Sequence, residues 1–286
     1  MSQTAQSEFK MPDLRIVPSA ELVPHEREDE SRVGRLSERL RRSGFLKNPP
    51  IVTEALSAEG GPCFVVLDGA NRVSAARATK LPHVLVQVVR YDDPGIELTT
   101  WHHALSGFPA ERLERELAMV PGLTLGQEGL SHARALLARR EAIAYVVSDR
   151  ERALTLHGDR GLYERNALLN AVVDLYRDRA PFHRVRRDSL SGARARFSDI
   201  TALVVFPRFH PDEILEIATS GARLPAGITR HVIPWRALRV NAPLDILADP
   251  DRSIGDKNAW LTAWIAERVA EKNVRFYEES TVLFDE

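Results

Sequence analysis

The spacing of hydrophobic positions changes several times along the chain, and these changes predict alternating strands and helices. Short, mainly apolar runs are typical of buried strands, and they occupy residues 15–17, 51–53, 64–67, 84–89, 145–147, 153–156 and 202–206. Apolar residues at helical spacing instead predict helices at residues 31–43, 73–80, 163–176 and 211–220, and a helix-rich stretch at 110–144. The mixture predicts an α+β fold without internal repeats.

Composition narrows the class of protein but does not select a function. The chain has 286 residues, which suits one or two domains, and its 44% hydrophobic and 28% charged residues are ordinary for a globular protein. A formal net charge of −1 supplies no overall attraction to nucleic acid. Cys63 is the single cysteine, so the chain cannot form an internal disulfide or a cysteine-based zinc site. We therefore expect a cytoplasmic protein.

The N-terminal residues carry no apolar core of a signal peptide, and the sequence contains no apolar stretch long enough to cross a membrane. We expect a soluble protein that is not exported and has no membrane partner. Residues 1–12 are polar and aperiodic, and we expect them to form a loose tail.

The sharpest local pattern is Asp68-Gly69-Ala70-Asn71-Arg72, which follows one predicted strand and leads into a helix. A strand that turns into a helix presents free backbone N–H groups to an anion, so phosphate is the natural ligand. Gly69 would allow close approach, Arg72 would bind phosphate oxygens, and Asp68 would hold a magnesium ion. The same residues also make a good turn and helix cap without any ligand.

Glu26 and Trp101 are further candidates for chemistry. Glu26 follows His25 in a predicted loop, where a carboxylate could accept a proton from an attacking hydroxyl, although several other acids lie nearby. Trp101 could form a wall of a small-ligand site, or it could be a core residue. The adjacent His102 and His103 are poorly placed to share one ion, so we do not expect zinc.

The segment Thr229-Arg230-His231 places a hydroxyl, a guanidinium and an imidazole side by side before an apolar run. Such a set suits a carboxylate or phosphate group, although an Arg-His pair at the start of a strand is often only surface. The basic run at residues 184–187 is interpreted as a solvated turn. Trp260 and Trp264 recur at helical spacing and are interpreted as packing residues.

In their order along the chain, five of these elements resemble the free serine kinases of the ParB-like superfamily. They are His25-Glu26, Asn48-Pro49-Pro50, Asp68-Gly69-x-x-Arg72, Trp101 and Thr229-Arg230-His231. The resemblance implies a ParB/sulfiredoxin-like nucleotide-binding domain at residues 13–108. It also implies a second mixed α/β domain at 109–286 that completes a cleft.

The resemblance also implies an activity, the transfer of the terminal phosphoryl group of ATP or ADP to the hydroxyl of L-serine with Mg²⁺. Glu26 would be the catalytic glutamate, beside Asp68, and residues 69–72 would bind nucleotide phosphates. Trp101, Thr229, Arg230 and His231 would bind serine. The C-terminal residues 275–286 resemble the branch that serves siderophore biosynthesis and uses ATP, whereas an archaeal branch uses ADP.

One departure from the family pattern concerns the phosphate-binding turn. Serine kinases often carry histidine inside it, whereas this chain has Ala70 and Asn71. Asn71 can donate a hydrogen bond but cannot become cationic, which puts the phosphate contacts of a kinase in question.

Three other activities occur among related folds. Sulfiredoxin chemistry is excluded because the turn contains no cysteine, and a chromosome-partitioning protein is disfavoured because strands continue through the second half. A ParB-like regulatory protein that binds nucleotide or DNA without kinase activity is the main alternative.

Overall fold

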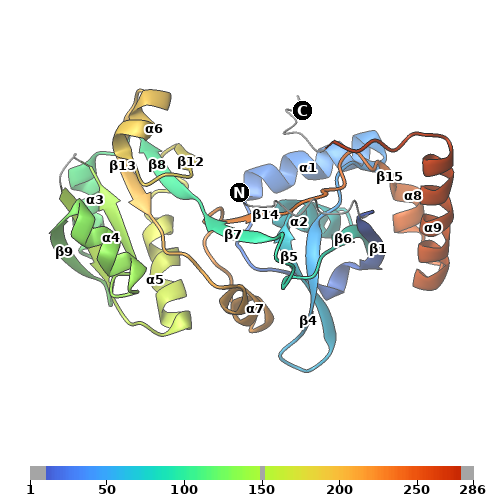
Figure 1. Cartoon of the computed structure of the whole chain (residues 1–286), viewed down its shortest axis with the longest axis horizontal. Coiled ribbons are helices and arrows are strands. Elements are labelled where there is room, and N and C mark those ends of the chain that lie inside the picture. The colour runs from blue at the N-terminus through green and yellow to red at the C-terminus, as the bar shows by residue number, and fades with distance from the viewer. Residues whose placement is uncertain (1–10, 149–151, 278–286) are drawn as a thin grey trace, which may run out of the picture.

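The computed structural model describes residues 11–148 and 152–277, which form two β-sheets joined by a short two-stranded ribbon (Figure 1). Among these residues no helix combines the length and the apolar character that a bilayer crossing requires. The first sheet and its helices lie on the right in Figure 1, and the second sheet lies on the left.

The first sheet has the strand order β1-β6-β4-β5-β2, in which β2 is parallel to β5 and β4 is antiparallel to it. Its strands are β1 (Asp13–Pro18), β2 (Leu22–Pro24), β4 (Ile51–Leu56), β5 (Pro62–Asp68) and β6 (His83–Val88). Helices α1 (Glu30–Ser43) and α2 (Ala70–Ala78) share a core with it, and Ser19–Glu21 forms a 3₁₀ turn. Asp29 caps the start of α1, and Gly44 ends it at a φ of 70°, as its place after the helical pattern predicts.

The second sheet is antiparallel throughout, with the order β12-β8-β13-β10-β11-β9. Its strands are β8 (His102–Ser106), β9 (Thr124–Gly129), β10 (Ala144–Val147), β11 (Arg152–His157), β12 (Phe182–Val185) and β13 (Ile200–Val205). One face packs on α3 (Ala110–Leu117) and α5 (Leu162–Asp174), and the other packs on α4 (Leu130–Ala138) and α6 (Leu190–Arg196). The predicted antiparallel partners at 145–147 and 153–156 are confirmed. The stretch at 110–144 is not wholly helical, because β9 separates α3 from α4.

Two elements connect the sheets. Strands β7 (Glu97–Thr100) and β14 (Thr229–Val232) pair antiparallel as a ribbon between them. Helix α7 (Pro211–Thr219) lies below this ribbon in Figure 1 and contributes apolar side chains to the cores of both halves. The two halves are therefore packed together as well as linked by the chain.

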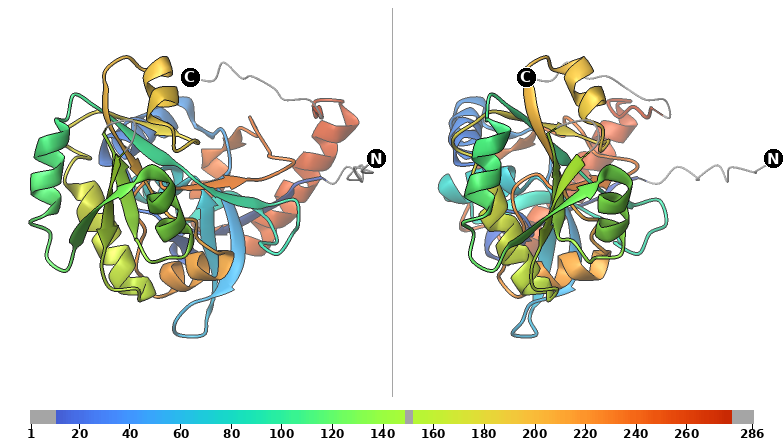
Figure 2. Two further views of the ribbon diagram at one scale, coloured as in Figure 1. Left: turned by 60° about the vertical axis from the view of Figure 1, so that its left-hand side comes forward. Right: turned by 90° about the vertical axis from the view of Figure 1, so that its left-hand side faces the viewer.

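The last helices return to the first sheet. The short strands β3 (Phe45–Leu46) and β15 (Ala242–Pro243) pair, after which α8 (Leu244–Ala248) and α9 (Ile254–Ala270) join the core of the first half. The left panel of Figure 2 shows the red helix α9 beside the blue strand β1. We therefore propose that residues 240–270 belong structurally with the first domain, although the sequence-based division at residue 109 groups them with the second.

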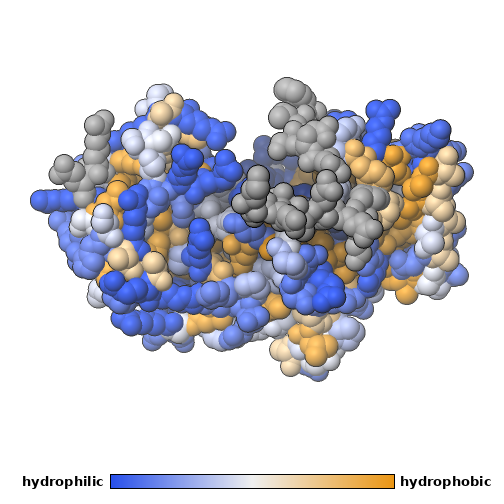
Figure 3. Space-filling view, viewed as in Figure 1, coloured by the Kyte–Doolittle hydropathy of each residue, from blue (hydrophilic) through white to orange (hydrophobic). Residues whose placement is uncertain are grey.

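Trp260 and Trp264 stack on each other with ring centroids 5.4 Å apart and pack against this core, in agreement with the packing role predicted for them. In the space-filling view, hydrophobic residues gather at the end of the molecule formed by α8 and α9, while hydrophilic residues cover most of the remaining face (Figure 3).

Candidate active site

The Glu26 carboxylate is held by the loop that leads into β14. Its Oε2 accepts a hydrogen bond from the backbone N–H of Gly227 at 2.8 Å. Its Oε1 accepts from the backbone N–H of Thr229 at 2.7 Å and from the Thr229 hydroxyl at 2.5 Å. A carboxylate offers about four acceptor positions, so one position on Oε2 remains open for a further donor.

Behind Glu26, the buried His25 continues the hydrogen-bonded chain. Its Nδ1 lies 2.6 Å from the carbonyl oxygen of Val66, and its Nε2 lies 2.7 Å from the Thr229 hydroxyl. Because a carbonyl oxygen can only accept, Nδ1 must carry a proton. The three contacts from Val66 through His25 and Thr229 to Glu26 need three protons in all.

A neutral imidazole, a hydroxyl and an ionised carboxylate supply only two of these protons. The chain of contacts is therefore one proton short when Glu26 is ionised and His25 is neutral. A proton delivered to Glu26 would complete it, which is the property required of a group that accepts a proton from a substrate.

The turn at Asp68 has the conformation that the sequence predicts. Gly69 adopts a φ of +100°, and a Cβ placed there would lie 2.9 Å from the Arg72 guanidinium, so only glycine fits. The Asn71 side-chain oxygen accepts from the backbone N–H of Asp29 at 2.9 Å and so ties the start of α2 to the start of α1. Ala70 is the first residue of α2.

Arg72 is occupied by protein groups. Its guanidinium donates to the carbonyl oxygens of Asn48 and Pro49, each at 3.1 Å, and pairs with Asp68 at 3.1 Å. Asp68 also pairs with Arg236. Burial opposes ionisation of Asp68, but Arg72 and Arg236 outweigh it and lower its pKa, so the carboxylate is charged and suited to bind a cation.

His231 lies close to both His25 and Asp68. Its ring meets the His25 ring edge-on at 5.3 Å, and its Nε2 lies 2.8 Å from the Tyr91 hydroxyl. Burial and the proximity of His25 lower the pKa of His231 to about 3, so the side chain is neutral at physiological pH. The structure thus brings Glu26, Asp68, Thr229 and His231 into one region.

Arg230 and Trp101 lie apart from this group. Strand residues alternate in direction, so Arg230 leaves β14 on the side opposite to Thr229 and His231. Its guanidinium lies 5.2 Å from the centre of the Trp101 ring. Arg230 lines a cavity of about 730 Å³ on the second half of the molecule, together with His102 and four other arginines. The three neighbouring residues of the predicted serine-binding segment therefore do not face one site.

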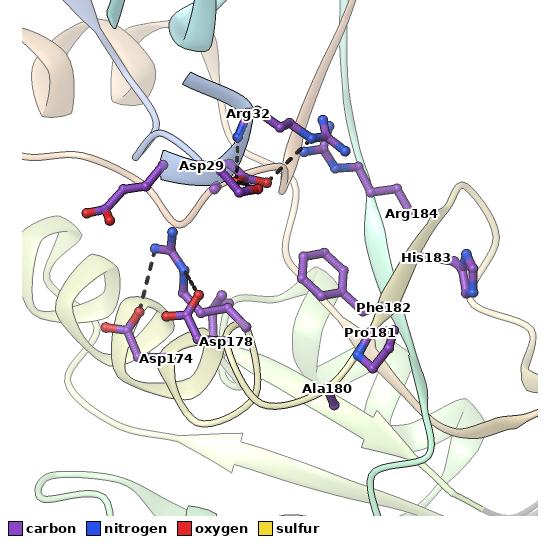
Figure 4. A pocket seen from close by; sticks show the side chains of 14 residues that line it. Asp29, Arg32, Asp174, Asp178, Ala180, Pro181, Phe182, His183 and Arg184 are labelled. Carbon is purple, nitrogen blue, oxygen red and sulfur yellow. Dashed lines mark hydrogen bonds and ion pairs between the residues drawn. The ribbon is translucent and has the colours of Figure 1, made fainter. Parts of the chain in front are cut away.

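A larger cavity, of about 860 Å³, lies between the two halves. It is lined by the start of α1 at residues 29–32, the end of α5 with the following turn, Ala226, and the strand β12 that carries Arg184 (Figure 4). The sequence predicts a solvated turn at residues 184–187; Arg184 is exposed, but it belongs to a strand instead of a turn and extends into this cavity. Phe182 and Val185, at the two ends of β12, are the only residues of this strand whose type favours a strand.

The described residues contain no group of three or more His, Cys, Asp or Glu side chains arranged to hold a metal ion. Asp68 offers the hard carboxylate oxygen that Mg²⁺ prefers, and nucleotide phosphates commonly supply the remaining ligands. These residues therefore fit a magnesium ion that arrives with a nucleotide rather than a metal bound by the protein alone.

Comparisons with known proteins agree with this arrangement. No protein-family model matches the chain. The ATP-dependent L-serine kinase SbnI of Staphylococcus aureus is 23% identical to it over 282 residues, covering 96% of this chain and 97% of that protein. An ATP-dependent L-serine kinase of Staphylothermus marinus is 23% identical over 244 residues, covering 79% of this chain and 88% of that protein.

Solved structures show the same fold. A free serine kinase in complex with AMP superimposes with a TM-score of 0.69 at 17% identity, covering 85% of this chain and 97% of that one. The C-terminally truncated SbnI of Staphylococcus aureus gives a TM-score of 0.68 at 21% identity, covering 91% and 97%. The chain has the fold of the free serine kinases. The predicted α+β class is confirmed.

The stretch 275–286, which resembles the siderophore branch, lies outside the described residues from position 278 onward.

Proposed function

We propose that this protein is a free L-serine kinase that transfers the terminal phosphoryl group of ATP to the serine hydroxyl and releases O-phospho-L-serine and ADP. The observation that carries the proposal is the Glu26 carboxylate, which retains an open acceptor position and is linked through Thr229 to His25 by hydrogen bonds that can take up one further proton. The relatives with this fold are named ATP-dependent L-serine kinases, which supports the same reaction.

In the proposed reaction the serine oxygen forms a bond to the terminal phosphorus while the bond from that phosphorus to the bridging oxygen of ADP breaks. The hydroxyl proton passes to Glu26, and Thr229 and His25 redistribute it away from the reacting oxygen. Phosphoryl transfer requires mainly positioning and charge stabilisation, so the cleft between the two halves suits the task.

Mg²⁺, held by Asp68 and the nucleotide, would neutralise charge on the phosphates. Asp68 is paired with Arg236 and Arg72, and we propose that Arg236, a half-exposed side chain from a loop, gives way when the nucleotide binds. Gly69 and the start of α2, with Ala70 and Asn71, would lie against the phosphate chain, while Arg72 holds the turn in shape. Trp101 and Arg230 remain candidates for the serine site on the strength of the family resemblance.

The proposal is tested by incubating the purified protein with L-serine, Mg²⁺ and either ATP or ADP, and by measuring O-phosphoserine by mass spectrometry. Glu26→Gln should lower kcat by about 10²- to 10⁴-fold, the contribution of a positioned general base. In this variant the NH₂ group of Gln would face the backbone N–H of Gly227 or Thr229, so two donors would meet and the loop would be destabilised. The melting temperature of the variant should therefore be measured as well.

Glu30→Gln is the matched control, since Glu30 is a nearby acid that lines the cavity between the two halves and has no hydrogen bond to the Thr229 loop. It should retain activity within about tenfold of the parent. Comparable losses in both variants would indicate an electrostatic effect without a general base. Absence of phosphoserine with either donor, together with tight binding of DNA in a filter assay, would instead favour the regulatory ParB-like protein.

A further inference from the structure

Of the three arginines that line the cavity between the two halves, two form ion pairs within the described residues and one does not. Arg32 pairs with Asp29 at 3.4 Å, and Arg177 lies within 4 Å of Asp174 and Asp178. Arg184 lines the same cavity, and the described part of the chain places no carboxylate oxygen within 4 Å of its guanidinium. It is therefore the unmatched cation of this cavity.

The position of Arg184 is fixed by the loop that binds Glu26. A Cβ at Gly227 would lie 2.4 Å from Nε of Arg184 and 2.5 Å from its Cζ, so the guanidinium rests directly on the glycine backbone. The N–H of the same glycine donates to Glu26. Gly227 thus contacts both the Arg184 guanidinium and the Glu26 carboxylate. Any side chain at position 227 would displace the guanidinium.

Arg184 is exposed to the water of the cavity, and neighbouring protein groups shield part of its guanidinium. Burial lowers the pKa of Arg184, although the attraction of Glu26 opposes this and water still enters the cavity. Arg32 adds a second positive charge, and Figure 4 shows Arg184 reaching from its strand toward Arg32 and Asp29. Two guanidinium groups that converge in a partly desolvated space favour a ligand with several negative oxygens.

Three of the four carboxylates that line the cavity are paired with arginines, and Glu30 is the fourth. Asp29 is offset by Arg32, and Asp174 is directed to Arg27, with which it forms a 2.8 Å ion pair. The start of α1 also contributes the positive end of a 14-residue helix to the same region. The part of the cavity next to Glu26 is therefore the part where an anion is favoured.

From this geometry we propose that Arg184 binds the terminal phosphoryl group of the nucleotide, on the side opposite to the Asp68 turn. The proposal rests on the proposed kinase function. Arg184 would neutralise charge on the phosphoryl group as it leaves ADP and joins the serine oxygen, whose proton passes to Glu26. Because Arg184 comes from the second half, the reacting group would be enclosed only when both halves contribute.

Kinetics and calorimetry on Arg184→Met test this assignment, with Arg187→Met as the control because Arg187 is an exposed residue of the same basic run outside the cavity. We expect Arg184→Met to lower kcat by about 10²-fold or more, as loss of one charge-stabilising donor does, with little change in KM for L-serine. Its affinity for ATP should fall at least tenfold while its affinity for AMP changes little. Arg184→Lys should recover part of the loss, since it restores charge without the bidentate fork.

Equal activity and equal ATP affinity in Arg184→Met and Arg187→Met would overturn the assignment while leaving the kinase function in place. If the parent makes no phosphoserine but Arg184→Met still loses ATP affinity selectively over AMP, the phosphate site stands and the kinase function fails. A variant that loses AMP and ATP affinity equally, with a lowered melting temperature, would show that Arg184 is structural and would also overturn the proposal.

Discussion

At the scale of single residues, Thr229 has a different environment from the one its place in the serine-binding segment suggests. Its hydroxyl lies between Glu26 and His25, and both contacts are shorter than 3 Å. Little of that hydroxyl remains for a substrate, so we infer that Thr229 acts through Glu26.

Thr229→Val separates these two roles, because valine keeps the shape and the backbone N–H but breaks the link from Glu26 to His25. We expect kcat to fall about tenfold or more, with KM for L-serine nearly unchanged and a shifted pH profile of kcat. Thr229→Ser restores the hydroxyl and should behave like the parent. A raised KM for serine with normal kcat would instead show that the hydroxyl contacts the substrate.

The motif at Asp68 shows that local spacing can predict a turn without predicting the contacts of its side chains. The pattern Asp68-Gly69-x-x-Arg72 predicted the turn and the glycine conformation correctly. It gave no sign that the Arg72 guanidinium would be held by backbone carbonyls of residues 48 and 49. Such contacts depend on which distant loop packs beside the turn, and local spacing does not contain that information.

At the scale of elements, α9 completes the edge of the first sheet. Strand β1 lies at the end of the strand order, so its outward backbone groups have no neighbouring strand. The Asn258 side chain replaces one, since its Oδ1 accepts from the N–H of Ile16 at 2.9 Å and its Nδ2 donates to the Ile16 carbonyl at 2.8 Å. An exposed edge is thereby covered by a helix.

Replacing Asn258 by alanine should leave both backbone groups of Ile16 without a protein partner. Each unsatisfied group that remains buried costs about 1–3 kcal/mol, and the contacts are only partly buried, so we expect a loss of about 1–3 kcal/mol in total. Urea unfolding followed by circular dichroism measures it. Asn273→Ala, beyond the end of α9, is the control and should change stability by less than about 0.5 kcal/mol. Equal stability of the two variants would mean that the contacts to Ile16 contribute nothing.

Sequence patterns predicted these elements unevenly. Strands with continuous apolar runs, such as β5 and β13, and helices with clear periodicity, such as α1 and α7, are where the spacing places them. Strand β12 has only four residues, of which two are His and Arg, and its pairing with β8 joins residues about 80 positions apart. Its existence follows from tertiary contacts, and Arg184 was missed for that reason.

At the scale of the whole molecule, the candidate site is assembled from segments far apart in the chain. Glu26 and Thr229 are separated by 203 residues, yet the Thr229 hydroxyl donates a hydrogen bond to the Glu26 carboxylate at 2.5 Å. The resemblance to serine kinases predicted that both residues matter, but their direct contact follows from the packing of the two halves through α7 and the ribbon.

Buried histidines make the stability of this assembly sensitive to acid. His103 accepts a hydrogen bond from the Tyr176 hydroxyl and donates to the Gly227 carbonyl, and burial lowers its pKa to about 3. In the unfolded chain the pKa of histidine is near 6.5, so the unfolded state binds more protons between pH 6.5 and about 3. The stabilisation is complete above pH 6.5 and is lost as the pH falls through this window.

We therefore expect the free energy of unfolding to decrease by up to about 1.4 kcal/mol per pH unit for each such histidine below pH 6. Melting curves of the parent and of His103→Gln between pH 7.5 and 4.5 measure this. The variant should be less stable at pH 7.5 but should show a shallower decline. A decline of equal slope in both proteins would mean that His103 is not responsible.

The alternation of side chains along β14 has a consequence for protein engineering. Thr229 and His231 face the proposed proton-transfer region, whereas Arg230 faces the other cavity. Neighbouring codons thus address opposite faces of one strand, of which only the Arg230 face lines the second cavity. A mutant library aimed at a new acceptor substrate should randomise Arg230 separately from Thr229 and His231. Substitutions on both faces at once would change substrate recognition and proton transfer together, so a selected activity could not be attributed to either face.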